Sequence, residues 1–311
     1  MGLGPTEAEF MLAEHRYKPI DGTLLTISRQ TIAMSPDFAK HLVTSAGLPL
    51  RSEALVSLDD KTLGHTLKDM DLISDDSFYA LFSGAKLSIL DVSDYEGADV
   101  IHDMNLPIGP ELENRYDFVM CGSCLDNIFD PVTALRNVAR LTKPGGRIFL
   151  FEWGNAFTTS YLRFTPEWFV DYFAVNGFSD VKSYLLHYPN LDGQERFTGG
   201  TVTDVYHYDP LVSGDGPPRY EPSAPQSLRF TMNFVIAEKG PDSTWDRTPI
   251  QAAHRMTEAE RRPYIEAAAR YQKSPRPLFR RGGVRPVGGD AALSRNGTLR
   301  SVASWVAGEP L

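Results

Sequence analysis

The sequence predicts an α/β fold in which helices cover both faces of a mostly parallel sheet. Residues 86–153 carry the decisive pattern, because three short apolar runs there, KLSILD, ADVIHD and YDFVMCGSC, each end in acidic or polar residues. An amphipathic segment, a Pro-Gly-Gly turn and a further apolar run, RIFLFEW, follow them. Runs of β-branched and aromatic residues separated by turn or helix signals are typical of parallel strands buried on both faces.

The remaining elements are read from apolar spacing and from turn and cap residues. In chain order we expect a helix at 6–15, a strand at 23–27, helices at 35–43 and 74–84, strands at 86–91, 98–103 and 116–120, a helix at 130–143, a strand at 147–153, a helix at 166–178, and strands at 179–188 and 227–240. Thr165 is expected to cap the helix that starts at Pro166, and Gly177 to end it.

Acidic and polar residues stand where neighbouring strands are expected to end. In open α/β sheets the ligand lies beyond the carboxyl ends of the strands, so Asp91, Asp103 and the segment 121–124 should point into one crevice. A carboxylate at such a position accepts two hydrogen bonds from a diol or one from an exocyclic amine.

The segments SILD, VIHD and RLTKPGGRIFLFE resemble the class I S-adenosylmethionine-dependent methyltransferases, over roughly residues 16 to 240. The resemblance implies a seven-stranded Rossmann-like sheet that binds S-adenosylmethionine and releases S-adenosylhomocysteine. Asp91 would bind the ribose hydroxyls and Asp103 the adenine amino group. Further cofactor positions implied in this way are Ser93, Met104, Cys121 and Gly122.

The first turn departs from that family. A glycine-rich turn should follow strand one, yet this chain has Ser28, Arg29 and Gln30 after TLLTI. Glycine permits positive φ and close approach of the backbone to a cofactor, so this turn needs another geometry. One hypothesis is that the Arg29 or Gln30 side chain binds the methionine carboxylate of the cofactor. The alternative is a solvated turn and a degraded site.

Two connections also have unusual lengths. Only VSDYEGA separates the second and third expected strands, so Tyr95 either lies across the adenine or ribose or is a surface tyrosine. The connection from about 31 to 85 is long and is interpreted as a lid over the pocket. The connection from Pro189 to Gln226 is rich in Gly, Pro, Asp and Tyr, and its VTDVYHYDP segment is interpreted as a substrate-facing flap.

Methyl transfer requires an aligned nucleophile and, for an oxygen or nitrogen, removal of its proton. The candidate catalytic residues are His207 in the flap, Asp126 and Glu152; His187 is a further candidate. His207 is the preferred base, the alternative being a structural histidine, and Asp126 is alternatively a helix cap. Trp153 and Tyr161 are candidates to wall an aromatic or sugar acceptor.

The only two cysteines form Cys121-Gly-Ser-Cys124. A redox site needs a thiol of lowered pKa, and a zinc site needs more ligands, so we favour a role in lining the pocket. No metal site is predicted. So few cysteines indicate a reducing compartment or a protein indifferent to redox conditions, and not a disulfide scaffold. No apolar run is long enough to span a membrane and the start lacks a secretory pattern, so a cytoplasmic location is expected.

The chain divides at about residue 240. Residues 1–240 are expected to form the methyltransferase domain, and they carry 19 Lys and Arg against 33 Asp and Glu. Residues 241–311 carry 12 against 7 and read as a C-terminal helix, with a capping box at Thr257 and Glu260, followed by a Pro/Gly/Arg-rich arm. The acidic domain argues against nucleic acid as a partner. The apolar end of the arm suggests a homodimer by subunit exchange.

Three functions remain open on the sequence alone. The first is a methyltransferase acting on an oxygen or nitrogen of a small molecule, such as a sugar or natural-product scaffold. The second is a catalytically inactive methyltransferase-like subunit that serves binding or assembly, which the missing glycine turn permits. The third is a different enzyme on the same sheet, disfavoured because no GxGxxG follows strand one.

Overall fold

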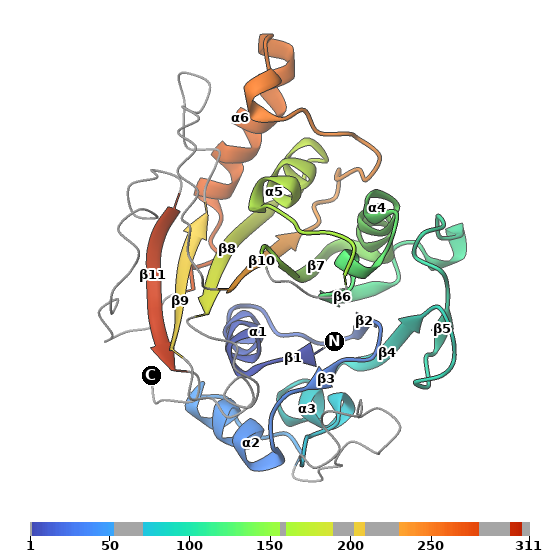
Figure 1. Ribbon diagram of the computed structural model, residues 1–311, viewed down its shortest axis with the longest axis vertical. Helices are drawn as coiled ribbons and strands as arrows, with labels where there is room; N and C mark the ends of the chain where they lie inside the picture. Colours follow the sequence, from blue (N-terminus) through green and yellow to red (C-terminus); the bar gives the residue numbers. More distant parts are fainter. Residues whose placement is uncertain are drawn as a thin grey trace.

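One large sheet runs through the protein in the computed structural model (Figure 1), which describes residues 2–52, 71–155, 160–188, 202–208, 230–279 and 299–306. Nine of the described strands form this sheet, in the order β11-β9-β8-β10-β7-β6-β2-β4-β5. The strands are β2 (Thr23–Ile27), β4 (Lys86–Asp91), β5 (Val100–Ile101), β6 (Tyr116–Gly122), β7 (Thr142–Trp153), β8 (Asp180–Tyr188), β9 (Val202–Tyr208), β10 (Phe230–Glu238) and β11 (Leu299–Val306). The pairings from β7 to β5 are parallel, and those on the other side of β7 are antiparallel. The α/β fold expected from the sequence is confirmed.

Helices cover both faces of the sheet, as Figure 1 shows. They are α1 (Pro5–Tyr17), α2 (Pro36–Ser45), α3 (Asp75–Phe82), α4 (Pro131–Leu141), α5 (Pro166–Val175) and α6 (Glu258–Lys273). Side chains of a strand alternate between the faces, so each strand supplies two cores. Phe149 and Phe151 of β7 pack with α1, α2 and α3, whereas Ile148 and Leu150 pack with α4 and α5.

The helix starts follow their cap residues. Ser35, Ser74 and Asp130 each accept a backbone N–H from the first turn of α2, α3 and α4, and Thr257 and Glu260 form the expected capping box of α6. Thr165 occupies the cap position of α5, but its side chain accepts no capping bond. α6 begins only at Glu258, because a short 3₁₀ turn, η4 (Ala252–His254), takes up part of the segment predicted to be helical.

The Pro-Gly-Gly turn lies inside β7 and not before it. The register between β6 and β7 shifts from Tyr116 opposite Thr142 to Phe118 opposite Arg147, so four residues of β7 lie opposite one of β6. Gly145 has a φ of +77°, a conformation that glycine adopts without steric cost. The turn therefore forms a bulge where β7 joins the sheet.

Strand β9 corrects the flap interpretation. Val202–Tyr208 pairs with β8 as a strand of the sheet, and the rest of the connection from 189 to 226 lies outside the described residues. The run VTDVYHY has the β-branched and aromatic composition of a strand. A second parallel pair, β1 (Gly2–Leu3) with β3 (Thr31–Ile32), forms a separate two-stranded sheet that was not predicted.

The C-terminal part of the chain packs on the same domain. α6 lies against α5 and β8 in Figure 1, and β11 pairs with β9 of its own chain. Backbone pairing within the chain thus supplies the partner that this segment was expected to find in a second subunit. The homodimer remains a prediction, but the apolar end of the arm no longer supports it.

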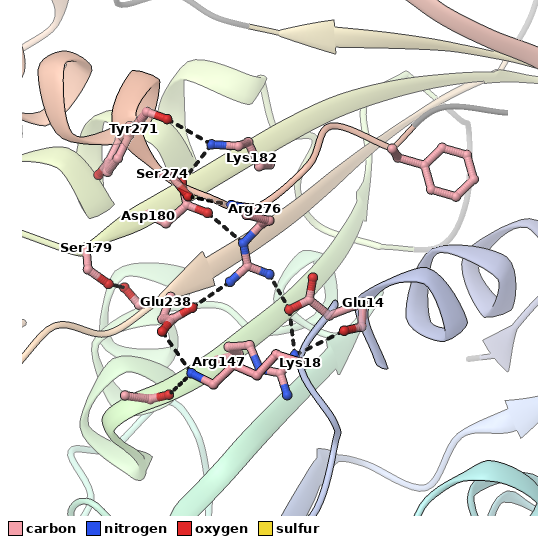
Figure 2. Close-up of polar contacts among 12 residues, drawn as sticks. Glu14, Lys18, Arg147, Ser179, Asp180, Lys182, Glu238, Tyr271, Ser274 and Arg276 are labelled. Carbon is pink, nitrogen blue, oxygen red and sulfur yellow. Dashed lines mark hydrogen bonds and ion pairs between the residues drawn. The ribbon is translucent and has the colours of Figure 1, made fainter. Parts of the chain in front are cut away.

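Arg276, just after α6, joins this segment to the sheet through a buried ionic cluster (Figure 2). Its guanidinium contacts Glu14 of α1, Asp180 of β8 at 2.6 Å and Glu238 of β10 at 2.7 Å. Glu14 also pairs with Arg147 of β7 at 2.6 Å. Arg276 is only 5 % exposed, so these carboxylates replace the water that its charge would otherwise require.

Replacement of Arg276 by methionine should destabilise the protein by about 3–5 kcal/mol, because it leaves buried carboxylates without their counter-charge. The free energy of unfolding from urea titration is the measurement. Arg262→Ala is the control, because Arg262 and its partner Glu266 are largely exposed, and it should cost less than about 1 kcal/mol. Equal losses in the two variants would contradict a supporting role for the cluster.

Candidate functional site

The parallel strands end at one edge of the sheet. The register aligns Ile27 of β2 with Leu90 of β4 and with Cys121 of β6, and Cys121 with Leu150 of β7. The residues just beyond this level are Ser28, Asp91, Gly122 and Phe151. Most of the predicted cofactor residues are therefore brought together at this edge.

Asp91 and Asp103 lie at neighbouring strand ends, as predicted. Asp91 pairs with Ile101 of β5, and Asp103 follows two residues later. From the spacing of strands and residues, the two backbone positions lie on the order of 8 Å apart. Asp91 accepts the backbone N–H of Val92 at 2.6 Å. This bond leaves room on the Asp91 carboxylate, which has about four acceptor positions.

Asn105 holds the Asp103 carboxylate. Both its backbone N–H (2.9 Å) and its side-chain amide (2.8 Å) donate to Asp103 Oδ1. These two bonds lower the pKa of Asp103, so it is ionised at neutral pH. The side-chain oxygen of Asn105, Oδ1, in turn accepts the N–H of Asp130, the cap of α4, at 2.9 Å. Asn105 was not among the residues predicted from the sequence, although an Asp side chain commonly accepts the backbone N–H two residues on.

The other predicted positions around these acids differ in their surroundings. Ser93 is exposed, and Tyr95, with 76 % of its surface exposed, stands in the open turn between β4 and β5. Met104 is buried, and Asn137 of α4 donates to its carbonyl oxygen at 3.3 Å. In this structure Tyr95 is the surface tyrosine of the two alternatives, and a place across the adenine stays a prediction.

Side chains build the first turn where the family has glycines. Ser28 has a φ of +59°, and its N–H donates to Leu90 O at 2.7 Å. The fully buried Gln30 folds back, and its Nε2 donates to the carbonyl oxygens of Ile27 (3.0 Å) and Ser28 (3.2 Å). Serine thus adopts the left-handed conformation, at a cost of about 1–3 kcal/mol that the surrounding bonds offset.

Arg29 binds groups of its own chain. Its Nη1 pairs with Asp75 of α3 at 2.6 Å, and its Nε donates to Glu96 O at 2.8 Å. Asp75 is fully buried, and that burial raises its pKa to about 6 even though Arg29 acts against the shift. The guanidinium is therefore neither a solvated turn residue nor directed at a ligand. It ties the first turn to α3 and to the loop after β4.

The CxxC segment lines the edge with thiols that form no disulfide. Cys121 and Cys124 are both buried and free, and Cys124 Sγ lies 3.0 Å from Ile27 O. The hydrogen bond between the two thiols, together with burial, raises the pKa of Cys121, and the same hydrogen bond lowers the pKa of Cys124. Both thiols are buried, whereas a reactive cysteine is at least partly exposed. Between them, a Cβ on Gly122 would lie 2.3 Å from the Phe151 ring and 2.6 Å from Gln30 Oε1, so only glycine fits.

Glu152 anchors the loop after β6. Its carboxylate accepts the backbone N–H groups of Cys124 (3.1 Å), Leu125 (3.0 Å) and Asp126 (3.3 Å) at the start of the 3₁₀ turn η2 (Leu125–Asn127). The side chain is fully buried, and that burial raises its pKa well above the usual range. With all three donors engaged, Glu152 is placed as a positioning residue and not as the predicted catalytic one.

Of the predicted catalytic residues, Asp126 lies at the carboxyl edge of the sheet, in the turn after β6. Its carboxylate accepts the Asn127 amide at 3.0 Å and lies 3.5 Å from the Ser123 hydroxyl. Burial raises its pKa. It caps no helix, because Asp130 caps α4. A buried carboxyl of raised pKa beside a loop end has the properties of a general base.

The two histidines lie away from the edge. His207 is on β9, and β8, β10, β7 and β6 stand between it and β2, which corresponds to about 24 Å. Its ring packs against Tyr184 with centroids 5.6 Å apart. His187 is buried on β8. The proposed mechanism therefore assigns neither a step, and Trp153 likewise belongs to the core below α1.

The described residues contain neither a cluster suited to a metal ion nor a helix suited to span a membrane. Within those ranges no group of three or more His, Cys, Asp or Glu side chains is arranged to hold a metal ion. None of the described helices combines the length and apolar character needed to cross a bilayer.

Comparison with known families agrees with this geometry. Residues 93–150, which run from the loop after β4 into β7, match the family model described as "Methyltransferase domain". This segment of 58 residues is similar to methyltransferase domains. The resemblance seen in the sequence is thereby confirmed for the segment that carries Asp103, the CxxC loop and Asp126.

Solved structures similar to this chain share little sequence with it. A Haemonchus contortus phosphoethanolamine N-methyltransferase 2, in complex with phosphomonomethylethanolamine and S-adenosylhomocysteine, is 12 % identical over 74 % of this chain and 52 % of its own, with a TM-score of 0.35. The CMeT domain of the citrinin polyketide synthase is 11 % identical over 76 % and 52 % (TM-score 0.36), and the [4+2]-cyclase SpnF is 13 % identical over 75 % and 80 % (TM-score 0.35). The chain thus spans about half the length of the first two. These likenesses assign no activity to this chain. No curated protein matches it.

Glu152→Gln should lower the free energy of unfolding by about 2–4 kcal/mol. The amide keeps one acceptor but turns an NH₂ toward buried N–H donors, and each unsatisfied buried group costs about 1–3 kcal/mol. Chemical denaturation measures the change, with the exposed Glu111→Gln as control, expected within about 0.5 kcal/mol. A Glu152→Gln protein as stable as wild type would refute the anchoring role.

Proposed function

We propose that the protein is an S-adenosylmethionine-dependent methyltransferase that transfers a methyl group to an oxygen or nitrogen of a small molecule. The observation that carries the proposal is the placement of Asp91 and Asp103 at the ends of adjacent strands, at the edge where β2 and β6 also end. In this proposal Asp91 binds the ribose hydroxyls and Asp103 the adenine amino group.

The residues at this edge fit the cofactor. Gln30 Oε1 is a buried acceptor without a hydrogen-bond partner among the described residues, and it lies beside Gly122. The cofactor carries an ammonium group, which would supply the missing donors. Because Arg29 is paired with Asp75, this acceptor supports a contact of Gln30 with the ammonium instead of the predicted contact with the carboxylate.

The bound cofactor supplies an activated methyl group on a sulfonium. The chain has to orient the acceptor, exclude water and remove a proton. Asp126 is the proposed base, because its raised pKa brings a carboxylate closer to the operating pH. Glu152 and Asn105 are positioning residues: one holds the loop of Asp126 and the other holds Asp103.

Calorimetric titration with S-adenosylmethionine and S-adenosylhomocysteine tests the cofactor site. Asp91→Ala removes charge-assisted hydrogen bonds worth about 1.5–3 kcal/mol, so the Kd should rise roughly 10- to 100-fold. Asp242→Ala, an exposed acid on the turn after β10, is the matched control and should bind as wild type does. If the wild-type protein binds neither compound, the chain is the inactive binding or assembly subunit.

Asp126→Asn tests the base. The variant should bind S-adenosylhomocysteine within about twofold of wild type, because Asp126 is not among the adenosine contacts, but turnover should fall roughly 10²- to 10⁴-fold. The base must be ionised, so wild-type kcat/KM should rise with pH through the raised pKa of Asp126, and the variant should lack this acid limb. An unchanged pH profile of kcat/KM would remove Asp126 from the mechanism.

A further inference from the structure

Two large aromatic side chains stand exposed where the chain leaves β6 and β7. Phe129 is 80 % exposed and Tyr161 69 % exposed. Phe129 immediately precedes Asp130, the cap of α4, and Tyr161 lies between β7 and α5. Their ring centroids are 5.9 Å apart, with an interplanar angle of 86°. An exposed pair of this kind at the carboxyl end of a sheet is unusual on a protein surface.

Hydrogen bonds of the backbone hold the segments that carry Phe129 and Tyr161 beside the proposed base. The N–H groups of Tyr161 (2.8 Å) and Leu162 (3.2 Å) donate to Asp126 O. On the other side, Asp130 N donates to Asn105, the residue that holds Asp103. The pair therefore lies between the loop that carries Asp126 and the hydrogen bonds that connect Asp130 through Asn105 to Asp103, the carboxylate proposed to bind adenine. Its position is set by the same contacts that set the site.

The geometry of the pair selects a shape of ligand. Two rings at right angles form a corner in which a flat ring stacks on one and meets the edge of the other. Each aromatic pairing contributes about 0.5–1.5 kcal/mol beyond the apolar area it buries. A saturated sugar can stack only through the C–H groups of one face, and the hydroxyls around its ring need hydrogen-bond partners where they are buried, so it gains less from two apolar rings.

We propose that the acceptor is a planar aromatic compound with a nucleophilic hydroxyl or amine, and that Phe129 and Tyr161 are the residues that bind its ring. The inference rests on the proposed function and narrows its substrate class. For a phenol, the oxygen forms a bond to the methyl carbon while the carbon–sulfur bond breaks and its electron pair stays on sulfur. The phenolic proton passes to the Asp126 carboxylate. The products are the aryl methyl ether and S-adenosylhomocysteine.

The test uses the full chain saturated with S-adenosylhomocysteine and titrated with 7-hydroxycoumarin, with cyclohexanol as the saturated counterpart. Wild type should bind the coumarin and not cyclohexanol. Phe129→Ala and Tyr161→Ala should each raise the coumarin Kd about tenfold and leave the Kd of S-adenosylhomocysteine within twofold. Phe129→Tyr, which keeps a ring, should restore binding. Ile265→Ala, which removes an exposed apolar side chain from α6 (58 % exposed), should change nothing.

The outcomes separate this inference from the proposed function. If S-adenosylhomocysteine binds but the coumarin does not, or binds all variants equally, the aromatic acceptor is refuted while the cofactor site stands. If methyl transfer from labelled S-adenosylmethionine reaches sugar hydroxyls and not phenols, the substrate class is likewise wrong. If wild type binds no S-adenosylhomocysteine, the proposed function and this inference both fall.

Discussion

The carboxylate of Glu152 is the constraint on which the carboxyl end of the sheet depends. The backbone turns sharply after β6, where Ser123 has a φ of +53°, and the next three N–H groups point into the protein. Water does not reach this buried position, so an acceptor from a neighbouring strand must satisfy them. That requirement explains why a charged residue stands near the end of the otherwise apolar β7. It also fixes the loop on which Asp126 lies.

In the turn after β2, side-chain groups also satisfy the backbone, but here they bind carbonyl oxygens instead of N–H groups. A glycine-rich turn leaves its backbone free to approach a cofactor, whereas here the Gln30 amide binds the carbonyl oxygens of Ile27 and Ser28. Arg29 is then free to serve the buried Asp75, which needs a counter-charge because ionised carboxylates are costly to bury. The turn thus leaves a side-chain acceptor, Gln30 Oε1, without a hydrogen-bond partner among the described residues.

Local patterns in the sequence were enough to predict seven of the nine strands of the central sheet, the capping box of α6 and the neighbouring acids Asp91 and Asp103. Apolar runs and cap residues act over a few positions, so they can be read without the fold. The contacts of Arg276 with Glu14 and of Arg29 with Asp75 join residues far apart in the chain, so no local sequence pattern predicts them. His207 was misplaced because its Gly- and Pro-rich surroundings outweighed a seven-residue run with strand composition. The exposed Phe129 was missed because burial of a single aromatic cannot be read from its neighbours.

The two ends of the sheet are held by different chemistry. At the amino end, side-chain ion pairs join α1, β8, β10 and the segment after α6, and buried charges are satisfied by one another. At the carboxyl end, side chains bind backbone groups of loops, as Glu152, Gln30 and Asn105 do. The loops at the carboxyl end are held from beneath, while the Phe129 and Tyr161 side chains above them stay exposed.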